Sequence, residues 1–345
     1  MLRLRGIRAA LCLTVLLCGC AASLPGRTPR TDAAPVVLAP QPLRGVGLAI
    51  HHVSMASGVY ALAERLRGPG EPPGPEEARE ASTSAGPPQR GGMTVTWYGH
   101  STVLLQLGKT MILTDPVLAG AVSLASPLPV RYGWPQLHLD QLRGIDAVVL
   151  SHGDFDHLHA PSLRMLAGRF PEAAIVLPDG LAHLEADAGF RRIHALPLNG
   201  SARIGAVTIT GLPAIHATRR NLLGIPDGTA FSWELRDPSH RVLFIGDSGY
   251  AAVFAEIGRR RGPYDLVLVP IGASEPRHLV GDMHMTPEEA VRLADDVRAK
   301  AAIGIHWGTF ALSPEPRGEP SRRFLRAGAT RNARTLSLGE TARFP

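Results

Sequence analysis

The sequence predicts a layered α/β fold that begins near Met93, and three observations support this. Short runs rich in β-branched and apolar residues recur after residue 93. Helical patterns alternate with these runs, as is typical of sheets covered by helices. Apolar residues make up 45% of the 345 residues and charged residues 19%, so the chain is neither disordered nor fibrous. The expected strands are 94–97, 102–107, 111–114, 145–150, 175–177, 206–211, 230–235, 242–245, 266–269 and 301–305.

The clearest helix is expected to begin at Thr286. The segment Thr286-Pro287-Glu288-Glu289 supplies a capping hydroxyl, a first-turn proline and a capping-box acid. Apolar side chains follow at helical spacing, which gives the helix one apolar face. We interpret this helix as structural.

Residues 1–19 are predicted to be a lipoprotein-type signal peptide. Basic Arg3, Arg5 and Arg8 precede an apolar run at 9–18, which is too short to cross a bilayer because a span needs about 20 residues. The ending Leu17-Cys18-Gly19-Cys20 resembles a bacterial lipobox, in which Cys20 would receive lipid. We therefore expect an exported protein of the bacterial cell envelope, anchored to a periplasm-facing membrane. Simple cleavage near Ala21-Ala22 is the alternative.

Residues 20–92 are expected to form a tether. Its first part is rich in proline, alanine and arginine, residues 45–66 are apolar enough for one amphipathic helix, and 68–92 is of low complexity. The sequence leaves open whether that helix is a lid, a docking element or a spacer. The folded domain is then predicted at 93–345.

Charge and cysteine content exclude several classes of function. The net charge is +6, and the signal arginines supply half of it, so the remaining charge gives no basis for nucleic-acid binding. All three cysteines (Cys12, Cys18 and Cys20) precede residue 21. The folded body therefore has no internal disulfide, cysteine metal site or cysteine nucleophile.

Metal-capable side chains follow four of the expected strands. The strand at 145–150 leads into His152-Gly153-Asp154-Phe155-Asp156-His157. His216, Asp247 and His306 follow the strands at 206–211, 242–245 and 301–305. Ligands collect at strand ends in sheets flanked by helices, so these residues are expected to form one site.

Each of these residues also has a structural interpretation when it is taken alone. A histidine beside a strand is commonly hydrogen-bonded without binding metal, and Asp247 in Gly-Asp-Ser-Gly suits a turn. The segment 152–157 is harder to explain in this way, because Asp154 and Asp156 would repel each other with no nearby lysine or arginine. A divalent cation would neutralise them, so the sequence predicts a metal site.

The ordered pattern of these residues resembles the metallo-β-lactamase superfamily. The resemblance covers roughly residues 93–310 and implies a four-layer αββα sandwich with a two-metal site. It also implies that Asp115 supports the ligand loop from behind. By this resemblance His152, Asp154 and His216 bind the first metal, Asp156, His157 and His306 bind the second, and Asp247 bridges the two.

The segments 96–103, 244–250, 270–277 and 304–310 resemble one branch more closely. That branch contains N-acylphosphatidylethanolamine-hydrolysing phospholipase D and related bacterial envelope proteins. His284 matches a histidine that lies near the metals in it. This chain departs from the family at Asp154, where most relatives have histidine, and at Ser274, where the branch usually has tyrosine. We expect two divalent metal ions with zinc favoured, while the harder carboxylate of Asp154 admits iron or manganese.

The resemblance implies a hydrolase in which a hydroxide shared by two metals attacks the phosphorus of a phosphodiester. Asp156 would orient the hydroxide, Asp247 would hold the metal pair, and His284 would donate a proton to the leaving group or stabilise its charge. His284 has an equally weighted alternative as a loop histidine before the Thr286 helix. For His100 we favour a structural or indirect role.

The expected substrate is N-acylphosphatidylethanolamine or a similar phospholipid, because a membrane tether brings the domain to such headgroups. Hydrolysis of a lactone or another small cyclic ester on the same metals is one alternative, since the fold does not separate the two. A non-catalytic envelope lipoprotein that binds metal is another. The sequence does not predict the oligomeric state.

Overall fold

The computed structural model describes residues 92–118, 122, 139–185, 188–218 and 228–345. The predicted signal peptide, the expected helix at 45–66 and Cys20 lie outside the described residues, as does the tether up to residue 91. All described residues belong to one compact unit of the chain, Leu38–Pro345. None of the helices in this described part is long and apolar enough to cross a membrane.

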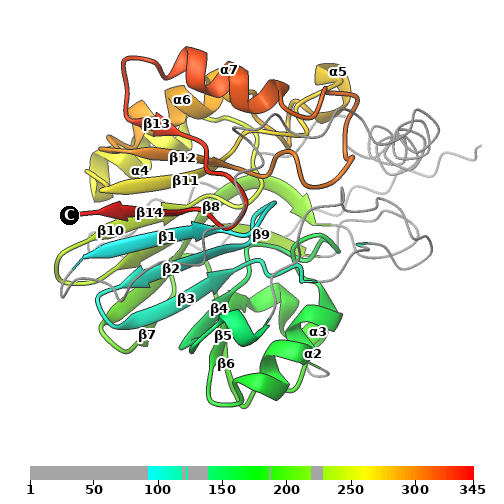
Figure 1. Ribbon diagram of the computed structural model, residues 1–345, viewed down its shortest axis with the longest axis vertical. Coiled ribbons are helices and arrows are strands. Elements are labelled where there is room, and N and C mark those ends of the chain that lie inside the picture. The colour runs from blue at the N-terminus through cyan, green and yellow to red at the C-terminus, as the bar shows by residue number, and fades with distance from the viewer. Residues whose placement is uncertain (1–91, 119–121, 123–138, 186–187, 219–227) are drawn as a thin grey trace, which may run out of the picture. The chain divides into compact units, whose positions relative to one another are not determined.

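The first of two sheets contains seven strands in the order β14-β1-β2-β3-β4-β5-β6 (Figure 1). The strands from β14 to β3 pair antiparallel, and those from β3 to β6 pair parallel. Their bounds are β1 Met93–Trp97, β2 Val103–Leu107, β3 Thr110–Thr114, β4 Ala147–Val149, β5 Ala174–Pro178, β6 Arg192–Leu196 and β14 Thr341–Phe344.

The second sheet also has seven strands, in the order β13-β12-β11-β10-β9-β8-β7. Here β10 to β13 are parallel, while β7 to β10 are antiparallel. Their bounds are β7 Ser201–Ile204, β8 Val207–Thr218, β9 Gly228–Arg236, β10 Arg241–Phe244, β11 Leu266–Pro270, β12 Ala302–Ile305 and β13 Ala333–Arg334.

Helices cover the outer face of each sheet. In Figure 1, α2 (Ala160–Arg169) and α3 (Ala182–Glu185) lie beside the first sheet, whereas α4 (Val253–Arg261), α6 (Pro287–Asp296) and α7 (Glu319–Ala327) lie beside the second. Helix α6 packs on β11 and β12. The shorter elements are η1 (Leu139–Gln141), η2 (Asp179–Leu181) and α5 (Arg277–Val280).

The burial pattern of the strands explains the four layers. In β4, Ala147 and Val149 join a core cluster that also holds Trp233 of β9 in the other sheet, whereas Val148 joins a second cluster with Leu163 of α2. Successive strand residues point to opposite faces, so β4 is apolar on both sides. The predicted αββα sandwich is confirmed.

An aromatic contact also joins the two sheets near their ends. Trp97, the last residue of β1, stacks on Trp307, which follows β12, with ring centroids 5.3 Å apart and planes 11° apart. Both side chains are buried. The stack therefore joins the first sheet to the loop that carries His306.

The expected strands all occur, but their ends differ. Strand β8 continues past its expected end at Gly211 to Thr218, with a register shift between Pro213 and Ala217, so His216 lies within the strand and not after it. The edge strands β6, β7, β13 and β14 were not expected, because they are short and lack continuous apolar runs. The helix after Thr286 is confirmed, with both hydrogen bonds of its capping box present.

We predict that two glycine-to-alanine changes in helices shift the free energy of unfolding in opposite directions. A Cβ on buried Gly258 of α4 would lie 1.9 Å from the carbonyl oxygen of Asp296 at the end of α6, so Gly258→Ala should lower the free energy of unfolding by about 2 kcal/mol or more. Exposed Gly168 of α2 has nothing within 4 Å of the added atom, so Gly168→Ala should raise it by about 0.5 kcal/mol. Denaturant unfolding of both variants checks this, and equal effects would contradict the described packing.

Candidate metal centre

The ligand residues predicted from the sequence converge on one place. The loop after β4 carries four of them, His216 comes from β8, and Asp247 and His306 follow β10 and β12. His216 Nε2 lies 3.2 Å from Asp154 Oδ2, and His306 Nε2 lies 3.0 Å from Asp247 Oδ2. His157 Nε2 lies 3.4 Å from the same Asp247 oxygen, and His152 Nε2 lies 3.4 Å from Asp154 Oδ2. Both sheets therefore contribute to the centre.

A glycine allows the loops of the two sheets to approach each other. Gly246 has φ +67°, and a Cβ at this position would lie 2.5 Å from the Cβ of Ser151. Any larger residue would push the loop after β10 away from the loop after β4. Gly246 thus permits Asp247 to reach the histidines of the other sheet.

Asp115 fixes the orientation of two predicted ligand histidines from behind. Its carboxylate accepts hydrogen bonds from the backbone N–H of Ser151 (2.8 Å), the Ser151 hydroxyl (2.5 Å) and Nδ1 of His157 (2.7 Å). Since the Ser151 proton is donated to Asp115, Ser151 Oγ accepts from Nδ1 of His152 (2.9 Å). Both imidazoles therefore carry their proton on Nδ1 and direct the lone pair of Nε2 into the centre. Asp115 lies where the family resemblance implied.

His216 is oriented in the same way. Its Nδ1 faces the carbonyl oxygen of Met283 at 3.3 Å, and this oxygen can only accept, so the Nε2 lone pair faces the carboxylate of Asp154. The Nε2 lone pair of His157 likewise faces Asp247. Two lone pairs that face each other are unfavourable unless a proton or a cation lies between them.

Several buried polar atoms of the centre also lack a hydrogen bond. Within the described part of the chain, these include His152 Nε2, His157 Nε2, His284 Nδ1, both ring nitrogens of His306, and Asp247 Oδ1. Each half of the centre offers two imidazoles and one carboxylate, with Asp247 between the halves. This set of nitrogen and oxygen donors fits a pair of divalent cations.

The pKa values of His157 and His216 also indicate that the centre favours positive charge. Burial disfavours protonation of His157, but the carboxylates of Asp247, Asp156 and Asp115 outweigh burial and raise its pKa well above the ordinary value. Burial is also outweighed at His216, whose pKa is raised by Asp154 and Asp247. In the absence of cations, protons would therefore occupy these positions.

His284 belongs to the centre. Its Nδ1 lies 3.7 Å from Asp247 Oδ2, and its ring lies 5.3 Å from that of His216 and 5.6 Å from that of His306. Burial lowers the pKa of His284 to about 3. His284 thus lies in the loop before the Thr286 helix and also close to the predicted ligands, while its role stays a prediction.

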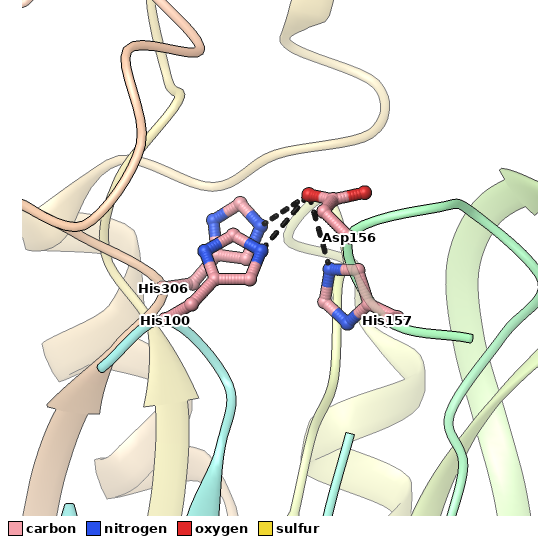
Figure 2. A group of neighbouring side chains, drawn as sticks. All are labelled: His100, Asp156, His157 and His306. Carbon is pink, nitrogen blue, oxygen red and sulfur yellow. Dashed lines mark hydrogen bonds and ion pairs between the residues drawn. The ribbon is translucent and has the colours of Figure 1, made fainter. Parts of the chain in front are cut away.

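The sequence alone did not predict where the side chain of His100 lies relative to the predicted ligands. Its Nε2 lies 2.9 Å from Asp156 Oδ2, which also faces Nε2 of His157 (3.6 Å) and of His306 (3.9 Å), as Figure 2 shows. Ligand atoms of these four residues lie within 4.8 Å of one another. The other described histidines do not join such a cluster: His159, His183, His194, His240 and His278. His51, His52 and His138 lie outside the described residues.

A cleft adjoins the centre. His100 and His306 line it together with Trp307, Phe310 and Arg317. Nε of Arg317 donates to the carbonyl oxygen of Gly308, another lining residue, at 3.1 Å, so the guanidinium lies against the cleft wall.

Ser274 braces the loop beside this cleft. Its hydroxyl donates to one carboxylate oxygen of Glu315 (2.6 Å) and its backbone N–H to the other (3.1 Å). Ser313 donates to the same carboxylate at 2.7 Å. At the position where the resembling branch usually has tyrosine, this chain therefore has a buried structural serine.

A comparison with family profiles identifies the family to which the chain belongs. The family profile described as "Beta-lactamase superfamily domain" matches residues 110–307, which is more than half of the chain. The chain belongs to the metallo-β-lactamase superfamily. A solved structure of a metallo hydrolase from Ignicoccus hospitalis has a TM-score of 0.56 at 20% identity, over 74% of this chain and 99% of that one. This likeness concerns the fold.

Two relatives are more similar in sequence. An uncharacterised protein of Mycobacterium tuberculosis is 40% identical over 241 residues, covering 68% of this chain and 64% of the relative. The N-acyl-phosphatidylethanolamine-hydrolyzing phospholipase D 1 of Caenorhabditis elegans is 35% identical over 232 residues, covering 64% of this chain and 65% of the relative. The chain thus spans slightly less than two thirds of either relative.

We predict that Asp115→Asn weakens cation binding. The amide cannot accept all the hydrogen bonds that hold Ser151 and His157, so affinity for Zn²⁺ should fall about 10–100-fold in competition with a chromophoric chelator. Asp237→Asn is the matched control, because Asp237 is a buried partner of His240 outside the ligand clusters. An unchanged affinity in Asp115→Asn, or an equal loss in both variants, would contradict this role.

Cation binding should also release protons at neutral pH. His157 and His216 have raised pKa values and must lose a proton before Nε2 can bind a cation, so up to about two protons should be released. Affinity should therefore increase as pH rises. Zn²⁺ titration calorimetry in two buffers of different protonation enthalpy measures the release. Binding without proton release and with an affinity that does not change with pH would show that the two imidazoles are already neutral.

Proposed function

We propose that this metal-dependent hydrolase is a phosphodiesterase of phospholipase D type that acts on N-acylphosphatidylethanolamine-like lipids. The observation that carries the proposal is the paired centre: two sets of imidazoles and a carboxylate meet at Asp247, beside a cleft that Arg317 lines. The named C. elegans relative supports the same substrate class.

The residues of the centre fit two divalent cations. In the proposed assignment His152, Asp154 and His216 would hold one, Asp156, His157 and His306 would hold the other, and Asp247 would serve both. Cations bound here supply Lewis acidity and a water molecule of lowered pKa as the nucleophile. Zinc remains the proposed metal, while the carboxylate of Asp154 also suits iron or manganese.

The protonation state of His284 favours one of its two predicted roles. Because burial lowers its pKa to about 3, its imidazole is neutral at neutral pH. A neutral ring can donate a hydrogen bond through N–H but carries no extra proton to transfer. We therefore propose that His284 stabilises charge on the leaving oxygen by hydrogen bonding and does not act as an imidazolium acid.

A guanidinium in the cleft supports a phosphodiester over a neutral lactone. Arg317 lies on the wall that continues from His100 and His306, and the Glu315 carboxylate, which lines the same cleft, is held by Ser274 and Ser313. A guanidinium forms strong hydrogen bonds with phosphate oxygens and gains much less from an uncharged ester. We further propose that lipid on Cys20 holds the protein at a bacterial envelope membrane, where such diesters are concentrated.

The test is product analysis with the full-length, Zn²⁺-loaded protein. N-acylphosphatidylethanolamine in mixed micelles should yield phosphatidic acid and an N-acylethanolamine. Asp247→Ala should reduce the rate by more than about 100-fold, since changes behind the ligands alone cost 10–100-fold in metal sites. Asp179→Ala, an exposed aspartate at the start of η2, should not change it. Activity that survives Asp247→Ala in a folded protein would reject the proposal.

A lactone substrate and an Arg317 variant separate the two hydrolase classes. Arg317→Met should lower kcat/KM for the phosphodiester about 10–100-fold, the value of a charged hydrogen bond, and leave any lactone turnover unchanged. Arg317→Lys should retain part of the phosphodiester rate. Lactone turnover with no lipid product would instead favour the cyclic-ester hydrolase. Two bound cations with turnover of neither substrate would favour a binding protein.

A further inference from the structure

The backbone of His100 is held by residues of both sheets. His100 lies between β1 and β2 of the first sheet with φ 53°, a conformation that few non-glycine residues adopt. Its carbonyl oxygen accepts from Trp97 Nε1 (2.8 Å) and from the backbone N–H of the predicted ligand His306 (2.9 Å). Its own N–H donates to Thr309 Oγ1 (2.7 Å). The ring is therefore projected from a fixed point.

The ring of His100 ends at the carboxylate of Asp156. The side chain is buried, with its ring 4.1 Å from that of His306 and edge-on to Phe310 at 5.1 Å. An ionised carboxylate only accepts hydrogen bonds, so His100 carries its proton on Nε2 and donates it to Asp156 Oδ2 at 2.9 Å. With Nε2 donating, this atom is not a metal ligand.

The hydrogen bond determines the direction in which Asp156 points. Asp156 is 18% exposed and follows the strand β4 in a loop, so packing alone restricts it less than the buried histidines. The oxygen bound by His100 is the one that faces Nε2 of His157 and of His306 (Figure 2). The remaining lone pair of that oxygen is thereby directed between these two imidazoles.

We propose that His100 is a positioning residue that holds the Asp156 carboxylate in the orientation needed for cation binding with His157 and His306. The proposal deepens the proposed hydrolase and rests on cation binding at its centre, whichever ester is the substrate. It assigns His100 to one half of the centre, because the ring of His100 contacts Asp156, His157 and His306, which belong to that half. Loss of the N–H donor should therefore weaken one cation and spare the other.

The test titrates Zn²⁺ into the metal-free full-length protein against a chromophoric chelator. His100→Phe retains a ring but removes the donor, and should weaken one of the two Zn²⁺ ions about 10–100-fold. The other ion should keep its affinity. His100→Gln offers an amide N–H at similar reach and should restore most of the loss. His159→Phe is the matched control, since His159 is a buried histidine bonded to Ser162 that belongs to none of the clusters.

Two results would overturn the proposal. Wild-type affinity for both ions in His100→Phe would show that Asp156 needs no orientation, and failure of His100→Gln to restore affinity would show that the ring, not its N–H, is required. If His100→Phe does not fold, His100→Asn replaces it, because asparagine tolerates positive φ but is too short to reach Asp156. Failure of the proposed function is distinguishable: the protein would then hydrolyse no phosphodiester while the selective loss of one ion persists.

Discussion

The structure depends on carboxylates and imidazoles that face one another where the two sheets meet. Asp154 faces His216 across the sandwich, and Asp247 faces His157 and His306, with nitrogen-to-oxygen distances between 3.0 and 3.4 Å. At His157 and His216, hydrogen bonds on the far side of the ring turn the Nε2 lone pair toward these oxygens. Positive charge at the middle, from cations or protons, therefore offsets the unfavourable approach of these carboxylates and lone pairs.

Much of this arrangement could be predicted from the sequence because the ligands lie beside strands whose apolar residues are easily recognised. The run before His152 is buried on both faces, and the strand before His306 leads straight to it. Strand β8 was predicted too short because Pro213, at the register shift, interrupts the pattern. Edge strands such as β6 carry exposed residues like Ile193 and give no apolar signal.

The contact between His100 and Asp156 also could not be predicted from the sequence, and here the reason is different. Its partner Asp156 is 56 positions away along the chain, and nothing near His100 in sequence suggests a carboxylate. The same holds for Arg317 and the cleft, which depend on how the loops after β11 and β12 fold over one another. The sequence pattern predicts candidate ligands, whereas the residues that orient these candidates become visible only with tertiary contacts.

The stacked indoles of Trp97 and Trp307 have a spectroscopic consequence. Two indole rings with centroids 5.3 Å apart couple their electronic transitions, and the sign and size of the resulting circular dichroism couplet depend on their mutual angle. One indole belongs to the first sheet and the other follows His306 in the second. The circular dichroism of this tryptophan pair therefore reports how the two sheets are aligned. The measurement needs neither substrate nor label.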